Sequence, residues 1–123
     1  MLNPQQQFGK TGEAIALKEL TNLGYTILEK NFRAKPGEID IIAKDKETIV
    51  FVEVKARRTK NFGNAKYSIT LNKQRKISMA ALSYLKKKNK MKNKARFDVV
   101  IIHSDSNKSA VEIIKNAFDL AYT

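Results

Sequence analysis

Apolar residues recur at two different spacings along the chain, and the first of these spacings is helical. From residue 11 to residue 23, apolar side chains follow a period close to that of an α-helix, at Ala16, Leu17, Leu20 and Leu23. Gly24 comes directly after them and is a natural stop for a helix. The pattern therefore predicts a first helix over residues 11–23.

A meander of three strands is predicted next. Runs rich in β-branched and aromatic residues cover residues 25–32, 38–43 and 48–55. Turn-forming residues separate these runs, at Pro36-Gly37 and at Asp45-Lys46-Glu47. The third run is apolar on both of its alternating faces where it begins, which indicates a strand that is buried on both sides.

The second half of the chain predicts a helix, a strand and a short tail. Helical spacing favours a second helix over residues 71–85. Its inward positions are expected to be Ile77, Ala81, Tyr84 and Leu85. Residues 95–103 contain a strand-like run, and a short final element is expected over residues 110–120. Residues 57–68 and 86–94 have no hydrophobic period, so we expect a mobile loop and a flexible, lysine-dominated connector there.

These elements predict the α/β class, with a mixed central β-sheet flanked by helices. The 123 residues suit a single domain over residues 1–123. Residues 1–8 are polar and are expected to be flexible. We find no signal peptide and no apolar run of membrane-spanning length, so we expect a cytoplasmic protein with no membrane partner.

Composition limits the kinds of metal site that the chain can build. There is no cysteine and a single histidine, His103, which excludes a disulfide framework, a thiolate zinc site and a histidine-rich metal cluster. Any metal ion must therefore be held mainly by carboxylates. Carboxylate oxygens favour hard cations such as Mg²⁺ or Mn²⁺.

Positive charge is the strongest compositional signal. The chain has 24 Lys and Arg against 12 Asp and Glu, which gives a formal net charge of +12. Every charged residue from Lys55 to Arg96 is a Lys or an Arg. Clustered cations gain affinity for nucleic acid by releasing its counterions, so the distribution predicts a surface that binds nucleic acid. A lysine-rich surface that serves only solubility is the alternative.

Three ionisable residues on two neighbouring predicted strands form the main candidate site. Glu53 and Lys55 share one face of their strand, and a hairpin would place Asp40 beside Glu53. A divalent cation bound by both carboxylates would relieve their repulsion and could activate water for phosphodiester hydrolysis. Lys55 would orient that water or stabilise the charge on the phosphate. An ordinary ion pair on a half-exposed sheet is the alternative.

Two helical residues are further candidates. Glu13 lies on the inward side of the first predicted helix, where it is either an active-site acid or a first-turn glutamate favoured by the helix dipole. Gln74 shares a helix face with Ile77, and either bonds locally or reaches a metal-bound water.

Segments along nearly the whole chain resemble the YraN-like uncharacterised bacterial family. The matching segments include Gly12-Glu13, Gly37-Glu38-Ile39-Asp40-Ile41-Ile42, Phe51-Val52-Glu53-Val54-Lys55-x-Arg57, Lys73-Gln74 and Arg96-Phe97-Asp98-Val99. That family looks like a member of the restriction-endonuclease-like, PD-(D/E)xK nuclease superfamily, similar in plan to archaeal Holliday-junction resolvases. Ile39 stands where the superfamily's name has a proline.

The resemblance implies a role for each matching residue. Asp40 would be the motif aspartate, Glu53 and Lys55 the (D/E)xK pair, and Glu13 a further acid from the first helix. The three acids would hold Mg²⁺ or Mn²⁺. The resemblance also points to Arg57, Lys73 and Gln74 as positions that contact substrate. Arg33 and Arg58 are two further positions expected to contact substrate.

The sequence thus predicts a metal-dependent endonuclease that hydrolyses phosphodiester bonds, with DNA favoured over RNA and branched or damaged DNA among the candidate substrates. The alternative is a module with a nuclease fold that binds nucleic acid or serves a partner complex without turnover. Both a monomer and a homodimer remain open.

Overall fold

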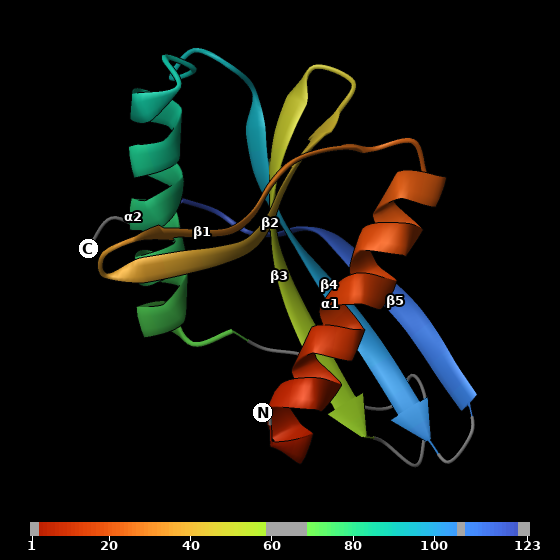
Figure 1. The fold of residues 1–123 in the computed structure, drawn as a ribbon. Helices are drawn as coiled ribbons and strands as arrows, with labels where there is room; N and C mark the ends of the chain where they lie inside the picture. The colour runs from red at the N-terminus through yellow and green to blue at the C-terminus, as the bar shows by residue number, and fades with distance from the viewer. Residues whose placement is uncertain (1–2, 59–68, 106–107, 121–123) are drawn as a thin grey trace.

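A five-stranded β-sheet with two helices packed on it makes up the part of the chain that the computed structural model describes, residues 3–58, 69–105 and 108–120 (Figure 1). Along the chain the elements are α1 (Pro4–Asn22), β1 (Thr26–Ala34), β2 (Gly37–Asp45), β3 (Thr48–Arg58), α2 (Leu71–Lys87), β4 (Ala95–Asp105) and β5 (Lys108–Phe118). This is the predicted succession of elements, except that a full strand, β5, replaces the expected short tail.

The sheet is mixed, with its strands in the order β1-β2-β3-β4-β5. Neighbouring strands run antiparallel except β3 and β4, which run parallel and are connected through α2. A parallel pair needs such a crossover, which is usually a helix. The predicted fold class is confirmed: the chain has an α/β, restriction-endonuclease-like core in which helices flank a mixed central sheet.

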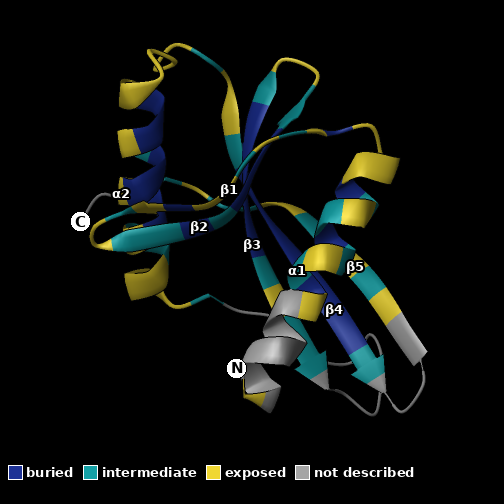
Figure 2. Cartoon of the chain, viewed as in Figure 1, coloured by how far each residue is buried: buried dark blue, intermediate teal, exposed yellow. Residues whose placement is uncertain are grey.

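The two helices cover opposite faces of β3. Successive side chains of this strand point alternately into two hydrophobic clusters, one packed against each helix. Val50 and Val52 pack in the same cluster as Leu20 of α1. Phe51 points the other way and packs against Tyr84 of α2, with the ring centroids 6.0 Å apart. These residues are buried, so the centre of the sheet is covered on both sides, as predicted (Figure 2).

The hairpin of β1 and β2 extends across α2 (Figure 1). Gly37, the first residue of β2, lies so close to α2 that a Cβ atom there would overlap the backbone carbonyl of Lys76. Phe32 of β1 contacts Tyr84 edge to face, with the ring centroids 5.3 Å apart. These contacts hold the tip of the hairpin beside the first half of α2, where the candidate site lies.

Strand β5 corrects the prediction of a short tail, and a buried polar network explains how the strand is held. Asp98 of β4 is fully buried, and its carboxylate accepts a 2.9 Å hydrogen bond from the backbone N–H of Asn116 in β5. The same carboxylate accepts bonds from Arg96, which also donates to the hydroxyl of Tyr25 at 2.7 Å. The side chain of Asp98 thus binds the backbone of β5 at the position where the register between β4 and β5 shifts.

Several predicted boundaries move. Helix α1 begins at Pro4 rather than at residue 11. The prediction that Leu23 faces inward from this helix is wrong, because Leu23 follows the helix and is 54% exposed. Helix α2 continues to Lys87. The four residues predicted to face inward from α2 are all buried, as expected.

The predicted loop and flexible segments are tested only in part. Strand β3 continues through Arg58, so residues 57 and 58, predicted in the loop, belong to the strand, and residues 59–68 lie outside the described residues. The expected flexibility of residues 1–8 and 86–94 stays a prediction. Neither α1 nor α2 is long and apolar enough, over its described residues, to cross a membrane.

Candidate active site

The side chain of Asp40 joins β2 to β3 at the level where their backbone pairing ends. Ile41 and Val52 are the last paired residues before the two strands part. The carboxylate of Asp40, one residue before Ile41 in β2, accepts a 2.8 Å hydrogen bond from the backbone N–H of Val54. Asp40 precedes Ile41 by one residue and Glu53 follows Val52 by one residue, so in this antiparallel pair they lie at the same level of the two strands.

Glu53 lies in the interior between β3 and the first turns of α2. Only 7% of its surface is exposed, although it carries a carboxylate. The ammonium nitrogen of Lys73, on α2, lies 3.7 Å from Oε1 of Glu53, and the Lys73 side chain is 47% exposed. One end of this ion pair is therefore buried and the other end reaches solvent.

The two carboxylates are costly to ionise together. Burial and the nearby charge of Asp40 raise the pKa of Glu53 from 4.5 to about 7, against the opposing effect of Lys73. Burial is also the main cause that raises the pKa of Asp40, and the charge of Glu38 adds to it. The hydrogen bond from Val54 acts in the opposite direction, because it stabilises the ionised form.

Lys55 lies close enough to influence both acids. It shares a face of β3 with Glu53, and its charge lowers the pKa of Asp40 and of Glu53. Its side chain is exposed, so its ammonium group lies at the solvent side of the pair. The predicted association of Asp40, Glu53 and Lys55 is thus present, with Lys73 as a fourth member.

The helical candidates differ from one another. Gln74 donates a 3.0 Å hydrogen bond from Nε2 to the backbone carbonyl of Ile69, which is the local alternative left open by the sequence. Glu13 is half-buried on α1, next to Gly12, where an added Cβ would lie 3.0 Å from the Cβ of Ala56 on β3. Within the described residues, no three Asp, Glu, His or Cys side chains are grouped to hold a metal ion, so the metal-binding role of Glu13 stays a prediction.

The predicted substrate-binding arginines take different positions. Arg33 lies on β1, where its Nε is 3.7 Å from Oε1 of Glu38 across the hairpin. Arg57 is a half-buried residue of β3, two positions beyond Lys55 on the same face. Arg58 ends β3, and its side chain lies outside the described residues.

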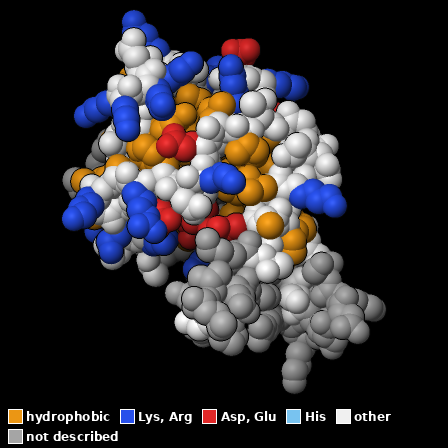
Figure 3. Space-filling model, in the orientation of Figure 1, with side chains coloured by type: hydrophobic (Ala, Val, Ile, Leu, Met, Phe, Trp, Pro, Cys, Tyr) orange, Lys and Arg blue, Asp and Glu red, His pale blue; other side chains and the backbone are white. Residues whose placement is uncertain are grey.

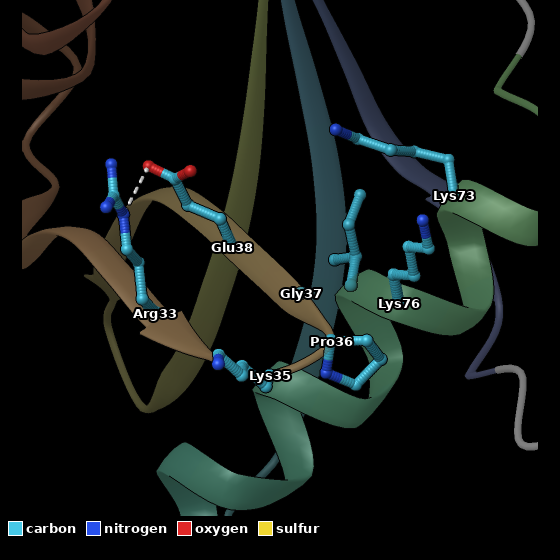
Figure 4. Close-up of a pocket in the computed structure, with 8 residues that line it drawn as sticks. Arg33, Lys35, Pro36, Gly37, Glu38, Lys73 and Lys76 are labelled. Carbon is cyan, nitrogen blue, oxygen red and sulfur yellow. Dashed lines mark ion pairs between the residues drawn. The ribbon is translucent and has the colours of Figure 1, made fainter.

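A cleft of about 430 Å³ opens between the tip of the β1–β2 hairpin and the first half of α2 (Figure 4). The cations that line it are Arg33, Lys35, Lys73 and Lys76, with Glu38 as the acid among them. We refer to this feature as the hairpin cleft. Sequence reasoning missed Lys35 and Lys76, although Lys76 follows Lys73 by three residues on a helix and so had to lie on the same side.

Lys and Arg side chains gather over the end of the hairpin and over the C-terminal end of α2 on the face drawn in Figure 3. Acidic side chains lie between these groups, in the middle of the same face. A polyanion that approaches this face would therefore meet cations on two sides of an acidic centre.

The donor set fits a hard divalent cation. Burial and mutual repulsion make it costly for two neighbouring carboxylates to ionise. An ion with two positive charges bound between them stabilises both ionised forms. Mg²⁺ commonly uses one or two protein carboxylates and takes its other ligands from water and phosphate oxygens. Asp40 and Glu53 supply that number of acids, and their carboxylate oxygens are the ligand type that Mg²⁺ prefers.

Comparison with known proteins gives a family and no activity. The family model described as uncharacterised protein family UPF0102 matches residues 12–102. A UPF0102 protein of Desulfosudis oleivorans is 56% identical over 97% of this chain and 95% of its own length. Another, from Geotalea daltonii, is 50% identical over 98% of this chain and 95% of its own length.

One solved structure is similar at a much lower level. A protein described as the crystal structure of SSO0001 shares 16% sequence identity and a TM-score of 0.40, and the match covers 94% of this chain and 54% of that chain. At this score the likeness adds nothing to the description of the fold or the site.

Proposed function

This chain belongs to the uncharacterised protein family UPF0102, and from the geometry of its site we infer that it is a metal-dependent nuclease that hydrolyses phosphodiester bonds. One observation carries the proposal. Two carboxylates, Asp40 and Glu53, lie together in a poorly solvated position, and the cations Lys55 and Lys73 stand beside them at the solvent side. A structural ion pair would not need two acids with raised pKa values in one place.

Asp40 and Glu53 are the residues that would hold Mg²⁺ or Mn²⁺, with Glu13 as the third candidate. When bound, the ion would supply Lewis-acid stabilisation of the phosphate and a lowered pKa for water. The hydrogen bond from Val54 fixes the Asp40 carboxylate, so the pair is preorganised before any ligand enters. Burial of Glu53 excludes bulk water, which strengthens each electrostatic interaction at the site.

The two lysines have distinct roles in the proposed reaction. Lys55 presents an exposed ammonium group beside both acids, where it can orient the attacking water or stabilise negative charge that grows on the phosphate. Lys73 holds Glu53 at 3.7 Å and is half exposed, so it can transfer its contact to a phosphate oxygen when substrate arrives. Both roles require the positive charge and not merely the length of the side chain.

The proposed substrate is nucleic acid, with DNA preferred over RNA. The net charge of +12 favours a polyanion, and the stretch from Lys55 to Arg96 contains no acid to oppose it. The preference for DNA rests on the resemblance of the motif residues to PD-(D/E)xK nucleases. Branched or damaged DNA is the proposed structural class within it.

Cleavage of a panel of labelled substrates tests this proposal. The panel contains single-stranded DNA, duplex, flap, four-way junction and a structured RNA, each incubated with Mg²⁺, with Mn²⁺ and with EDTA. We expect the wild-type protein to cut at least one DNA only when metal is present. Lys55→Ala should lose that cleavage, while Lys18→Ala, which removes an exposed lysine of α1, should retain it.

Two outcomes would count against the nuclease. If the wild-type protein binds the panel at low salt and cuts none of it with either metal, a module that binds without turnover explains the protein better. If Lys55→Ala cuts as fast as Lys18→Ala, the catalytic assignment of Lys55 is wrong. Binding alone does not separate the two functions, because both require a cationic surface.

A further inference from the structure

We propose that the hairpin cleft binds a phosphate group of the nucleic-acid strand next to the phosphodiester bond that is cut. This inference rests on the proposed function and adds to it the part of the substrate that the protein holds. The cleft would grip the strand on one side of the carboxylate pair, so that the scissile phosphate is presented to Asp40 and Glu53.

The first argument is the charge of the cleft. Four cations line it, Arg33 and Lys35 from the hairpin on one side and Lys73 and Lys76 from α2 on the other (Figure 4). Glu38 is the acid in the lining, and it pairs with Arg33 at 3.7 Å. The surplus of positive charge inside a concave site focuses the field on an anion that enters it.

The second argument is that the cleft is continuous with the carboxylate pair. Lys73 lines the cleft, yet its ammonium nitrogen lies 3.7 Å from Glu53. Glu38 also lines the cleft and stands two residues before Asp40 on β2. A phosphate in the cleft would therefore lie beside residues that adjoin both acids, and the next phosphate along the strand would be directed toward Asp40 and Glu53.

The third argument is that the cleft is built on close backbone packing. The chain at Gly37 lies against the backbone carbonyl of Lys76, and no side chain fits between them. The hairpin tip and the helix are thereby held at a set separation, while the charged ends of Lys35 and Lys76 stay exposed. Cations on a fixed frame bind an anion at a smaller entropic cost than cations on a mobile loop.

The size of the cleft indicates which form of nucleic acid enters it. Its volume of about 430 Å³ falls in the range of small-molecule sites. A nucleotide with its phosphate is of this size, whereas a double helix, whose major groove alone is about 12 Å wide, is not. The cleft thus takes a phosphate with about one nucleotide, either as an internal link or as a strand end.

The experiment measures binding separately from cleavage. Labelled single strands and flap DNA are titrated in Ca²⁺ at several salt concentrations against wild type, Lys35→Gln/Lys76→Gln and a control with the same loss of charge, Lys18→Gln/Lys115→Gln. All four lysines are exposed, so neither double variant should disturb the fold, which thermal unfolding checks. We expect the cleft variant to bind about ten-fold more weakly and to lower the salt slope by about 1, with little change in the control.

Neutral methylphosphonate links, placed one at a time along the strand, locate the phosphate. In wild type, the link that occupies the cleft should weaken binding, and in the cleft variant the same link should have no further effect, because the interaction is already lost. Strands that end in a phosphate at that position, compared with strands that continue past it, distinguish a strand end from an internal link.

The outcomes separate this inference from the proposed function. If wild type cuts DNA with metal while the cleft variant binds with the affinity and salt slope of the control, the cleft assignment is overturned and the nuclease stands. Equal sensitivity of both double variants to the same methylphosphonate would also overturn it. If wild type neither binds nor cuts any strand, the proposed function itself has failed.

Discussion

The backbone N–H of Val54 donates a 2.8 Å hydrogen bond to the carboxylate of Asp40, so a side chain connects two strands just where their backbone pairing stops. This bond links fold to site. Strand β3 continues beyond the last β2–β3 pair, so the backbone N–H of Val54 has no backbone partner on β2. Without an acceptor at residue 40, this N–H would lose its hydrogen bond. The same carboxylate is one of the two acids proposed to bind metal, so structure and chemistry depend on one side chain.

Substitutions at Asp40 should separate these two duties. Asp40→Asn keeps a carbonyl oxygen that can accept from Val54 but removes the charge, so we expect a protein that unfolds at or above the wild-type temperature and does not cut. Asp40→Ala removes the acceptor as well and should cost about 1–3 kcal/mol of stability. Thermal unfolding and cleavage of the same preparations check this. Equal stability of the two variants would show that the hydrogen bond contributes little.

The raised pKa of Glu53 predicts how the stability of the metal-free protein depends on pH. Its pKa is about 7 in the folded protein against 4.5 for the ordinary side chain, so the folded state holds the proton more tightly. The contribution of Glu53 to the free energy of unfolding is therefore largest below about pH 4.5. It decreases as the pH rises from 4.5 to 7, and above pH 7 it no longer changes. The shift corresponds to at most about 3 kcal/mol.

Glu53→Gln removes this dependence because the amide does not ionise. In EDTA at pH 8 we expect the variant to unfold at a higher temperature than wild type, by several degrees. At pH 5 the difference should be much smaller. A variant that is less stable than wild type at pH 8 would contradict the raised pKa and favour a stabilising Glu53–Lys73 ion pair.

Divalent metal should reverse the order of stability. Mg²⁺ or Mn²⁺ that binds the folded protein and not the unfolded chain raises the free energy of unfolding by RT ln(1 + [M]/Kd). The unfolding temperature rises with it. We expect this rise at pH 8 in wild type and its loss in Asp40→Asn and in Glu53→Gln. Isothermal titration gives the same answer without unfolding. A rise of equal size in all three proteins would place the metal elsewhere.

The alternating pattern of β3 was sufficient to predict the core of the site. It placed Glu53 and Lys55 on one face, and the hairpin turn brought Asp40 to the neighbouring strand. Both inferences are local, because strand alternation and a short turn fix relative positions over a few residues. The motif roles that the family resemblance implied for Asp40, Glu53 and Lys55 fall on these same positions.

Other parts of the site depend on long-range packing that a pattern cannot supply. The contact between Lys73 and Glu53 exists because α2 crosses from β3 to β4 over one particular face of the sheet. The hairpin cleft exists because Gly37 lets the β1–β2 turn approach α2 closely. Strand β5 was predicted only as a short final element for a third reason: Lys115 and Asn116 interrupt its alternation, and the bond from Asn116 to Asp98 compensates only in the folded state.

Gly37→Ala should damage both stability and the cleft. The added Cβ would overlap the backbone of Lys76, which has no flexible end to move aside, so the hairpin must shift from α2. We expect a loss of about 2 kcal/mol or more in urea unfolding. Gly12→Ala is the matched control, because the nearest atom to its Cβ would be the Cβ of Ala56, at 3.0 Å, with no overlap of the kind found at Gly37, and it should cost less. The opposite order would mean that the hairpin adjusts freely.

Arg96 should prove essential to the fold and dispensable to the chemistry. It donates to the fully buried carboxylate of Asp98, to the hydroxyl of Tyr25 and, at 3.0 Å, to Asp45, and so connects the start of β4 to the residue before β1, to the end of β2 and to the β5 contact. Arg96→Met would leave Asp98 charged, buried and without its guanidinium partner, which costs about 3–5 kcal/mol. Asp45→Asn, at the more exposed end of the network, should cost about 1 kcal/mol or less.

Urea unfolding ranks the two variants, and cleavage is then measured at a temperature where both are folded. We expect rates per folded molecule close to that of wild type, because none of the described contacts of Arg96 involves Asp40 or Glu53. A folded Arg96→Met protein that binds metal normally and cuts no substrate would instead place Arg96 in the reaction.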